Sequence, residues 1–266
     1  MIMNEIVQYF SANSWIIVII CAVAGYLTGS VSFARIIYYL VTREKSLGSF
    51  AEPVPHSDET FESDLVSATL VGKKLGARFG CATSIADMLK VALPTLLVRI
   101  WFPEHQYHLV LAVFGVMGHN YPLYHGFRGG RGESPIFGVL FVVNWFGVLI
   151  VNVAATVLGF ITGSVLVIRF GGYVLLIFWF WYYFNDLRYV VFIIILNFFY
   201  WFSMRKDLAR FNELKKSKGL KFTEEDVSEF ILMGRSIGRM LDKYSLYALW
   251  KNKFNRKKNI NDHPEG

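Results

Sequence analysis

Residues 135–168 read PIFGVLFVVNWFGVLIVNVAATVLGFITGSVLVI, a run that contains no charged side chain. A helix needs about 20 apolar residues to cross a bilayer core of about 30 Å, so this run is too long for one span. Its middle, Asn144-Trp145-Phe146-Gly147, offers residues that suit a turn. The stretch therefore predicts two consecutive membrane-spanning helices.

The rest of the chain has the same apolar character. Hydrophobic residues make up 54% of the 266 positions before the 22 glycines are counted, whereas soluble domains reach about 45–50% with glycine included. This composition excludes a disordered chain, a disulfide scaffold and a collagen-like repeat. Cys21 and Cys81 lack the ligand spacing of a zinc site, so we expect no metal and no other cofactor.

The apolar runs alternate with polar loops, which predicts an all-α, polytopic transmembrane bundle of about seven spans. Lys and Arg prefer cytoplasmic loops, and nearly all of the 27 fall on one side of this arrangement, with Arg188 on the other. We therefore expect the N-terminus outside and the C-terminus inside. No cation precedes the first apolar run, so we expect it to stay as an anchor. The predicted spans are residues 15–41, 82–102, 107–124, 135–146, 148–168, 171–184 and 189–204.

The net charge of +7 belongs mainly to the end of the chain. We divide the chain into a transmembrane domain, residues 1–204, and a basic cytoplasmic tail, residues 205–266. Basic residues that follow a membrane span usually face an anionic leaflet, so we expect the lipid bilayer rather than nucleic acid as the partner.

The tail contains a predicted amphipathic helix. Thr223 and the three acids after it suggest a helix start, and Arg235, Arg239 and Lys243 recur every fourth residue beside an apolar stripe. Such a helix could lie on an anionic leaflet, pack against the membrane domain, or form a small cap with a solvated face.

The most distinctive polar stretch is residues 118–132, GHNYPLYHGFRGGRG, at the cytoplasmic end of the third span. Four of its glycines lie within seven residues, so their backbone N–H groups can turn toward one point. Arg128 and Arg131 add planar guanidinium groups that suit phosphate oxygens. The stretch is typical of an anion cradle, although a flexible turn that follows the positive-inside rule would have a similar composition.

Asp87 and Lys90 lie inside the second span, three residues apart and therefore on one helical face. An ionisable residue costs about 3 kcal/mol at the centre of a span and usually faces a polar interior. We interpret the two residues as a structural ion pair in that interior, with direct catalysis as the alternative.

A third polar stretch combines Gly29-Ser30-Val31-Ser32 in the first span with the cytoplasmic loop 42–81. The loop carries KSLGS at 45–49, an acidic piece from Glu52 to Asp64, and VSATLVGKKLG at 66–76. Hydroxyls, glycines and lysines together suit phosphate binding, although any solvated loop has a similar composition. Small residues such as Gly25 and Gly29 more often allow close packing of membrane helices.

In this order, the motifs resemble those of the bacterial acyl-phosphate:glycerol-3-phosphate acyltransferases, integral membrane enzymes that make lysophosphatidic acid without acyl-CoA. Residues 118–132 are the most specific part, because they are close to the family's Gly-His-x-Phe-Pro and Phe-Lys-Gly-Gly-Lys-Gly, with arginine at both lysine positions. Asp87–Pro94 is similar to the family's Asp-x-x-Lys-Gly-x-x-Pro, and Gly29–Phe33 to its Gly-Ser-Ile-Pro. The resemblance runs from about residue 25 to residue 210.

The chain departs from the family pattern at Glu133, where the family has an apolar residue, and in two longer segments. Met204 and Asp207 replace a histidine and an asparagine after the last span. In the phosphate loop, Lys45 stands for an arginine, and an acidic insertion separates Gly48-Ser49 from Ser67-Ala68-Thr69. Because carboxylates repel a phosphate ligand, we predict that the insertion bulges away and that the two pieces meet at its base.

The resemblance implies transfer of an acyl group from acyl phosphate to glycerol 3-phosphate at the cytoplasmic face of the plasma membrane. No Ser-His-Asp or Cys-His spacing indicates a covalent intermediate, so we expect direct attack by the substrate hydroxyl. A non-catalytic relative that binds an anionic lipid or phosphate ligand, and a small anion transporter, are the alternatives. The implied catalytic residues are Ser30, His119, Asn120 and Arg131, and the implied substrate- or phosphate-binding residues are Lys45, Ser49, Ser67, Thr69, Lys73, Arg128, Gly129, Gly130 and Gly132.

Overall fold

The computed structural model describes residues 14–48, 50–53, 60–63, 66–217, 223–230, 235–251 and 253. The chain packs as two compact units. We call residues 1–52, 62–145 and 184–207 the core unit, and residues 53–61, 146–183 and 208–266 the hairpin unit. The predicted division into domains at residue 204 stays a prediction.

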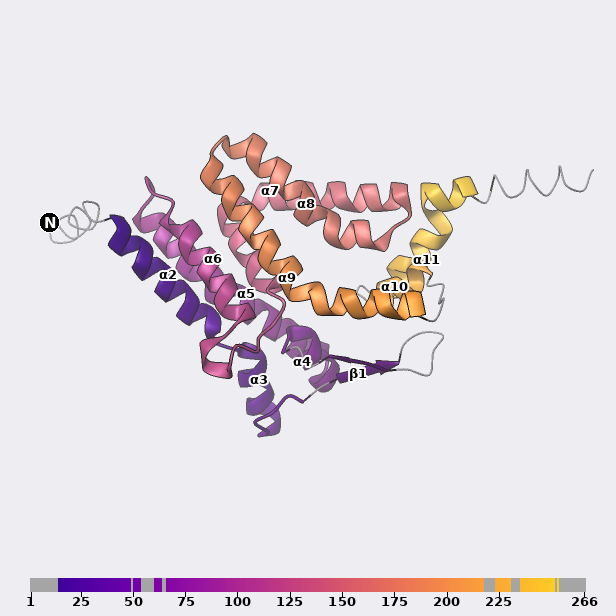
Figure 1. The fold of residues 1–266 in the computed structure, drawn as a ribbon, viewed down its shortest axis with the longest axis horizontal. Helices are drawn as coiled ribbons and strands as arrows, with labels where there is room; N and C mark the ends of the chain where they lie inside the picture. The colour runs from indigo at the N-terminus through magenta and orange to yellow at the C-terminus, as the bar shows by residue number, and fades with distance from the viewer. Residues whose placement is uncertain are drawn as a thin grey trace, which may run out of the picture. The chain divides into compact units, whose positions relative to one another are not determined.

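Helices form nearly all of the regular structure, as expected for apolar segments whose backbone groups must be hydrogen-bonded internally in a bilayer. Two short strands, β1 (Phe50–Pro53) and β2 (Thr60–Ser63), pair within the loop 42–81, which the sequence did not predict. The helices are α2 (Ser14–Ser30), α3 (Phe33–Thr42), α4 (Ala68–Leu75), α5 (Ala77–Trp101), α6 (Tyr107–Asn120), the 3-10 turn η1 (Leu123–His125), α7 (Glu133–Thr162), α8 (Val165–Phe184), α9 (Leu187–Ser217), α10 (Glu224–Phe230) and α11 (Arg235–Tyr244) (Figure 1).

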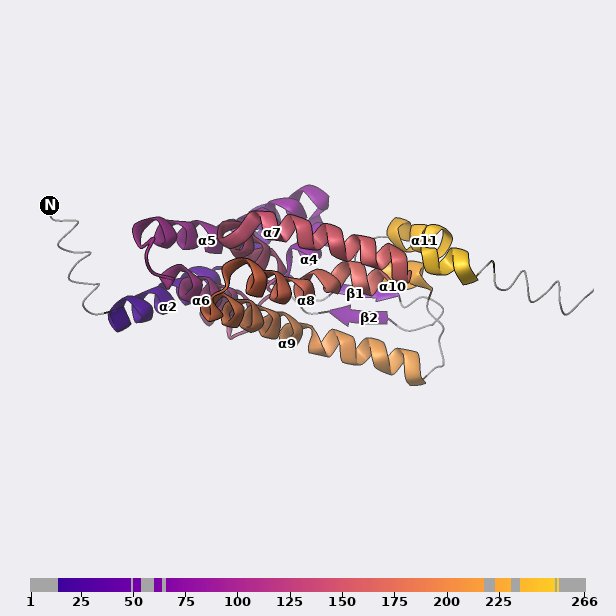
Figure 2. The ribbon, with the colours of Figure 1, turned by 90° about the horizontal axis from the view of Figure 1, so that it is seen from above.

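Glycines let α2 and α6 lie at close range in the core unit. A Cβ atom on Gly25 would collide with the carbonyl oxygen of Leu111, and one on Gly29 with that of Gly115. Gly118 meets the carbonyl of Tyr26 in the same way. The two helices run side by side in Figures 1 and 2 and pack closely along their length. The prediction that small residues serve close packing here is confirmed.

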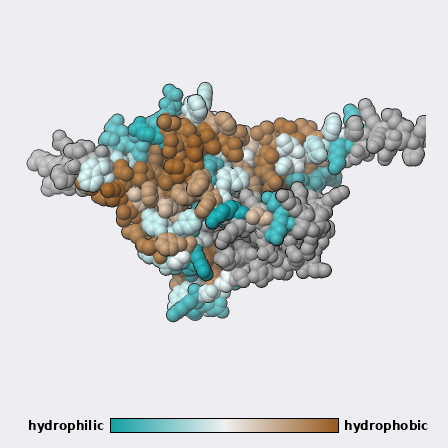
Figure 3. All heavy atoms as spheres, in the orientation of Figure 1, coloured by the Kyte–Doolittle hydropathy of each residue, from teal (hydrophilic) through white to brown (hydrophobic). Residues whose placement is uncertain are grey.

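Among the residues that the structure describes, five helical segments are long and apolar enough to cross a membrane: Trp15–Thr42, Ala77–Trp101, Glu133–Thr162, Val165–Phe184 and Leu187–Arg205. Helix α6 is shorter, with 14 residues. On one face of the core unit, Figure 3 shows apolar side chains over the helices and hydrophilic ones where α3 ends. The polytopic, all-α membrane fold is confirmed, whereas the count of seven spans and the orientation stay predictions.

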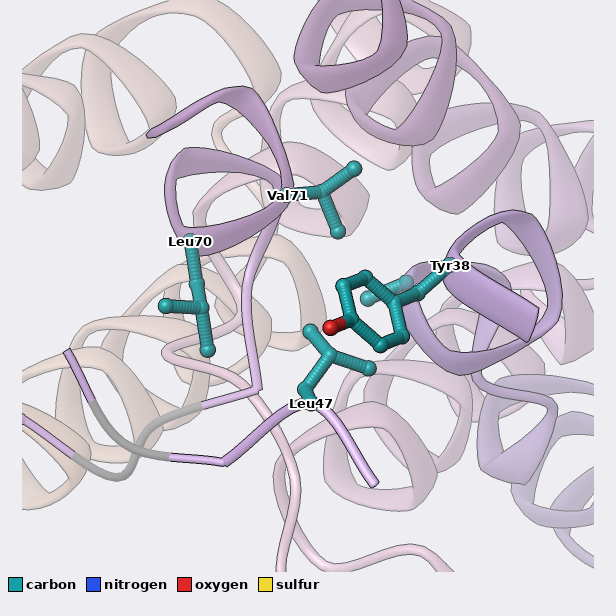
Figure 4. Close-up of a cluster of buried hydrophobic side chains, with 5 residues drawn as sticks. Tyr38, Leu47, Leu70 and Val71 are labelled. Atoms are coloured by element: carbon teal, nitrogen blue, oxygen red, sulfur yellow. The ribbon is translucent and has the colours of Figure 1, made fainter. Parts of the chain in front are cut away.

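A buried cluster joins the two sides of the acidic insertion. Leu47 precedes the insertion and packs with Leu70 and Val71 of α4 and with Ala34 and Tyr38 of α3 (Figure 4). The ammonium of Lys74 also donates to the carbonyl of Leu47. The chain on either side of the insertion therefore meets at its base, as predicted. Ser49 and most of the insertion lie outside the described residues.

Helix α7 bends at Asn144, whose φ of −157° and ψ of 79° are not helical. A break in a membrane helix frees backbone carbonyls, which must find other donors. The guanidinium of Arg99 in α5 donates to the carbonyls of Val142 and Val143, just before the break. The predicted turn at 144–147 is therefore a sharp bend inside one helix rather than a loop between two.

In the hairpin unit, the second half of α7 turns into α8 at Gly163-Ser164. Gly163 has a φ of +69°, which a residue with a Cβ rarely adopts, so it ends the helix. The predicted spans 148–168 and 171–184 were therefore wrong in their boundary. Arg169, taken as a loop residue, lies inside α8.

Candidate functional site

A small pocket in the core unit gathers residues from the three polar stretches of the sequence. Helix α2 supplies its last turn, α5 supplies the Asp87–Lys90 pair, and the end of α6 supplies His119 and the glycine-rich segment after it. The lining residues are Gly29, Ser30, Val31, Ser32, Val66, Asp87, Lys90, His119, Pro122, Gly129 and Gly130. Segments that are far apart in sequence thus meet at one end of the helices.

Lys90 is the charged centre of this pocket. Its side chain is 5% exposed and that of Asp87 is 3% exposed. The ammonium donates to Asp87 Oδ1 at 2.8 Å, to the Val31 carbonyl at 2.5 Å and toward His119 Nδ1 at 3.0 Å. An ammonium has three protons, so these three partners use all of them. The Val31 carbonyl is available because the helix breaks between α2 and α3.

The contact with Lys90 determines the tautomer of His119. Lys90 can only donate, so Nδ1 must accept and the ring proton must reside on Nε2. Asp87 Oδ1 is 3.7 Å from Nδ1, too far for the competing hydrogen bond. Nε2 lies beside Gly130, because a Cβ atom there would collide with it. A neutral His119 therefore presents an N–H donor to the pocket at the glycine-rich segment.

Two glycines fix the course of this segment. Gly130 approaches the His119 ring, and its N–H donates to the His119 carbonyl at 3.2 Å. Gly132 has a φ of +82° and packs on the side-chain amide of Asn120. Asn120 donates to the Phe199 carbonyl at 3.4 Å and does not line the pocket. In this structure, Asn120 connects the segment to α9.

Ser30 is fully buried and connects the pocket to η1. Its hydroxyl donates to the Tyr26 carbonyl at 2.7 Å and accepts from the Leu123 N–H at 3.2 Å. One lone pair of the oxygen is left for a ligand, because a hydroxyl has two. The Ser30 oxygen can therefore accept one more hydrogen bond, and the role of Ser30 in orienting a bound group stays a prediction.

Side chains on other elements hold the backbone of the predicted arginines. Arg35 of α3 donates twice to the Arg128 carbonyl, at 3.2 Å each. The Ser203 hydroxyl of α9 shares its one proton between the carbonyl oxygens of Tyr200, at 2.7 Å, and Arg131, at 2.9 Å. The Arg128 side chain is exposed and that of Arg131 is half-buried, and neither lines the pocket. The sequence did not identify Arg35 or Ser203, since neither belongs to the polar stretches that it singled out.

The predicted phosphate loop contributes less to the pocket than expected. The Ser67 hydroxyl accepts from the Leu70 N–H at 3.2 Å and caps α4, and only its neighbour Val66 lines the pocket. Lys45, Thr69 and Lys73 are exposed. The hydroxyl of Ser67 therefore starts a helix, and any role of these residues with a ligand remains a prediction.

Two cations act on His125, which follows the pocket residue Pro122 in sequence. Partial burial and then the charges of Arg35 and Lys90 lower the pKa of His125, which ends η1. Both charges disfavour a further cation at His125. Among the described residues, no group of three His, Cys, Asp or Glu side chains could hold a metal ion. The arrangement can bind an anionic group through charge and through the Nε2–H of His119.

Comparison with known proteins identifies relatives of this chain. Residues 54–213 match the family model described as glycerol-3-phosphate acyltransferase. Two similar proteins are named glycerol-3-phosphate acyltransferase. The one from Francisella tularensis is 27% identical over 121 residues, which cover 46% of this chain and 53% of the relative. The one from Mycoplasma capricolum is 28% identical over 215 residues, which cover 70% of this chain and 77% of the relative. The chain thus spans about half the length of the Francisella relative.

The fold is also similar to crystal structures of PlsY (YgiH), an integral membrane glycerol 3-phosphate acyltransferase. Its glycerol 3-phosphate form aligns with a TM-score of 0.58 at 21% identity, covering 79% of this chain and 98% of that one. Its lysophosphatidic acid form aligns with a TM-score of 0.57 at 20% identity, covering 77% and 95%. These alignments show a shared fold.

Proposed function

Because this chain belongs to the glycerol-3-phosphate acyltransferase family, we propose that it moves a fatty acyl group from acyl phosphate to glycerol 3-phosphate. The observation that carries the proposal is the convergence of three separate polar stretches on one pocket around Lys90 and His119. Both substrates carry phosphate, and the cation Lys90 lies in this pocket. We further propose that the pocket opens to the cytoplasm and that the protein resides in the plasma membrane.

The proposed reaction is a direct transfer. A hydroxyl of glycerol 3-phosphate attacks the carbonyl carbon of the acyl phosphate, so that a new ester C–O bond forms and the C–O bond to phosphate breaks. Inorganic phosphate leaves with the electron pair of that bond and takes up the proton of the hydroxyl. No protein nucleophile is required, and positioning and charge supply the acceleration.

The side chains have distinct roles in this proposal. The Nε2–H of His119 donates a hydrogen bond to an oxygen of the departing phosphate, where negative charge develops, and His119 keeps its proton. Lys90 supplies the positive charge, and Asp87 holds it in place. Ser30 orients the acceptor, together with Ser49. The remaining proposed ligands of the two phosphates are Lys45, Ser67, Thr69, Lys73, Arg128, Arg131 and the glycines 129, 130 and 132, with Asn120 keeping these glycines in place.

The test is turnover by purified protein in lipid nanodiscs, supplied with a long-chain acyl phosphate and radiolabelled glycerol 3-phosphate. We expect lysophosphatidic acid and inorganic phosphate in equal amounts. Arg131→Ala removes a charge-assisted contact and should lower kcat/KM by about 10- to 150-fold, from about 1.5–3 kcal/mol. Arg131→Lys should be partly active, and Arg78→Gln, at an exposed position outside the pocket, should be fully active.

Two results would reject the proposal. A folded protein that binds glycerol 3-phosphate but forms no product is a non-catalytic relative, a reading favoured by the interrupted phosphate loop. Ligand flux across proteoliposomes without product would identify a transporter instead.

A further inference from the structure

The end of the chain carries an apolar surface that the proposed reaction does not use. After α11, residues 246–251 are again helical. Leu246, Tyr247, Leu249 and Trp250 form a surface that we call the tail patch, and each is more than half exposed. The helix before it buries its other face, since Leu241 is 0% exposed. Four large apolar side chains in five residues are too many to be scattered surface positions.

Contacts within the hairpin unit fix the level of the tail patch. A Cβ atom on Gly163 would lie 2.9 Å from Ser245 Oγ and 3.2 Å from Tyr247 Cβ, so the turn between α7 and α8 touches the beginning of the patch. The carboxylate of Glu224 also accepts from the Val165 N–H at 2.7 Å, at the first residue of α8. The tail is therefore attached to this turn at two points.

The turn at Gly163-Ser164 joins two candidate membrane spans. Both α7 and α8 are long and apolar enough to span a bilayer, and only Gly163 and Ser164 separate them. A turn this short between two spans lies where the hydrocarbon core ends. The contact of Tyr247 with Gly163 consequently puts the tail patch at the level of the lipid headgroups.

The chemistry of the patch suits that level. Tyr and Trp concentrate at membrane–water interfaces, where the ring is in lipid and the polar tip is in water. Lys243, Lys251 and Lys253 flank the patch, and Lys243 lies 5.0 Å from the Tyr244 ring. In the sequence, Arg256, Lys257 and Lys258 follow.

The acidic side chains nearby have partners within the tail. Glu225 pairs with Arg239 at 2.8 Å, and Asp242 accepts from the Glu225 N–H at 3.3 Å. Asp226 accepts from Thr223 at 2.7 Å. These carboxylates cap and join α10 and α11, so among the described residues they leave the lysines beside the patch without a carboxylate partner.

We propose that the tail patch docks on the anionic surface of the same bilayer that α7 and α8 cross, and so forms an interfacial anchor. Its aromatic and leucine side chains enter the headgroup region, and the flanking lysines contact anionic headgroups.

Lipid-specific quenching tests this docking on the full chain. Cys21 and Cys81 are replaced by alanine, a fluorophore is attached at Leu249→Cys, and the protein is placed in phosphatidylcholine nanodiscs with or without phosphatidylglycerol. Doxyl-labelled lipids quench only a probe that contacts lipid. We expect several-fold stronger quenching in discs with phosphatidylglycerol than at a control probe on Ser236→Cys, an exposed position in the first turn of α11. Quenching should weaken at 1 M salt, where the Debye length falls to about 3 Å.

The charge requirement is tested by Lys251→Glu combined with Lys253→Glu. This variant should lower the quenching at 249 to its level in pure phosphatidylcholine. Equal quenching at 249 and 236 in the anionic discs would overturn the proposal, since the patch would then face water or another protein. Unchanged quenching in the double variant would overturn the role of anionic lipid.

Discussion

At the scale of single residues, substitutions of Asp87 and Lys90 can distinguish a structural role of this pair from a catalytic one. Lys90→Met leaves the Asp87 carboxylate buried without its cation, so we expect a loss of about 3–5 kcal/mol in the free energy of unfolding. Adding Asp87→Asn removes the buried charge and should restore most of that stability. If Lys90 acts on substrate, the double variant stays inactive although it is stable. Acyl transfer measures the activity, and thermal unfolding measures the stability. A stable double variant with normal turnover would leave only the bracing role.

Gly130 offers a second test at this scale. In Gly130→Ala the new methyl group would collide with His119 Nε2 and push the ring out of its present position. Because a misplacement of about 1 Å can cost about 100-fold in rate, we expect kcat/KM to fall by up to that factor while the fold persists. Gly171→Ala in α8 is the matched control, since its Cβ would be 3.5 Å from the nearest atom. Equal activity of the two variants would remove His119 from the mechanism.

At the scale of elements, the cluster around Leu47 predicts that the acidic insertion is dispensable for folding. Replacing residues 52–64 with a short Gly/Ser linker should change the free energy of unfolding by less than about 1 kcal/mol, because loop closure depends weakly on length. Phosphate affinity should stay constant or rise at low salt, where repulsion by the removed carboxylates is least screened. Leu47→Ala, which empties the cluster, should instead cost about 2–5 kcal/mol. A folded linker variant without any ligand binding would show that the insertion builds the site.

The sequence predicted where helices exist better than where they end. Apolar length identified the segments that became α5, α7, α8 and α9, since burial in lipid depends on composition. The ends depend on local backbone geometry: the positive φ of Gly163 ended α7, and the Arg99 side chain allowed a bend at Asn144 without a loop. The predicted boundary between residues 168 and 171 was wrong because it placed Arg169 in a loop, where positive charge is common. A helix tolerates a single arginine, and Arg169 lies inside α8.

The candidate site divides in the same way. Ser30, His119, Gly129 and Gly130 were predicted and do line the pocket, because their motifs are local in sequence. The bond between Lys90 and His119 was not predicted, since it depends on how α5 and α6 meet. The side chains of Arg128 and Arg131 were expected to bind a ligand, but neither lines the pocket. Arg35 and Ser203 instead contact the backbone carbonyls of these two residues.

At the scale of the whole molecule, the orientation in the membrane makes a direct prediction. In a Cys21→Ala and Cys81→Ala background, single cysteines at Lys74, Arg128 and Lys258 should react only after the membrane is opened, because all three belong to the predicted cytoplasmic side. A cysteine at Arg188 should react from outside intact cells. Arg128 serves better than Gly132 as a probe, since Gly132 is buried with a positive φ. Reaction of the first three from outside would reverse the topology.

All three protons of the Lys90 ammonium are used in hydrogen bonds within the protein, which affects how fast a bound phosphate could leave. An incoming phosphate finds an ammonium that already donates to Val31, Asp87 and His119, so binding replaces one of these bonds rather than adding a fourth. The net gain is then the difference between two hydrogen bonds, and the protein partner returns when the ligand departs. Such a site would hold an anion loosely, so in the proposed reaction the release of free phosphate need not wait for a strong contact to break.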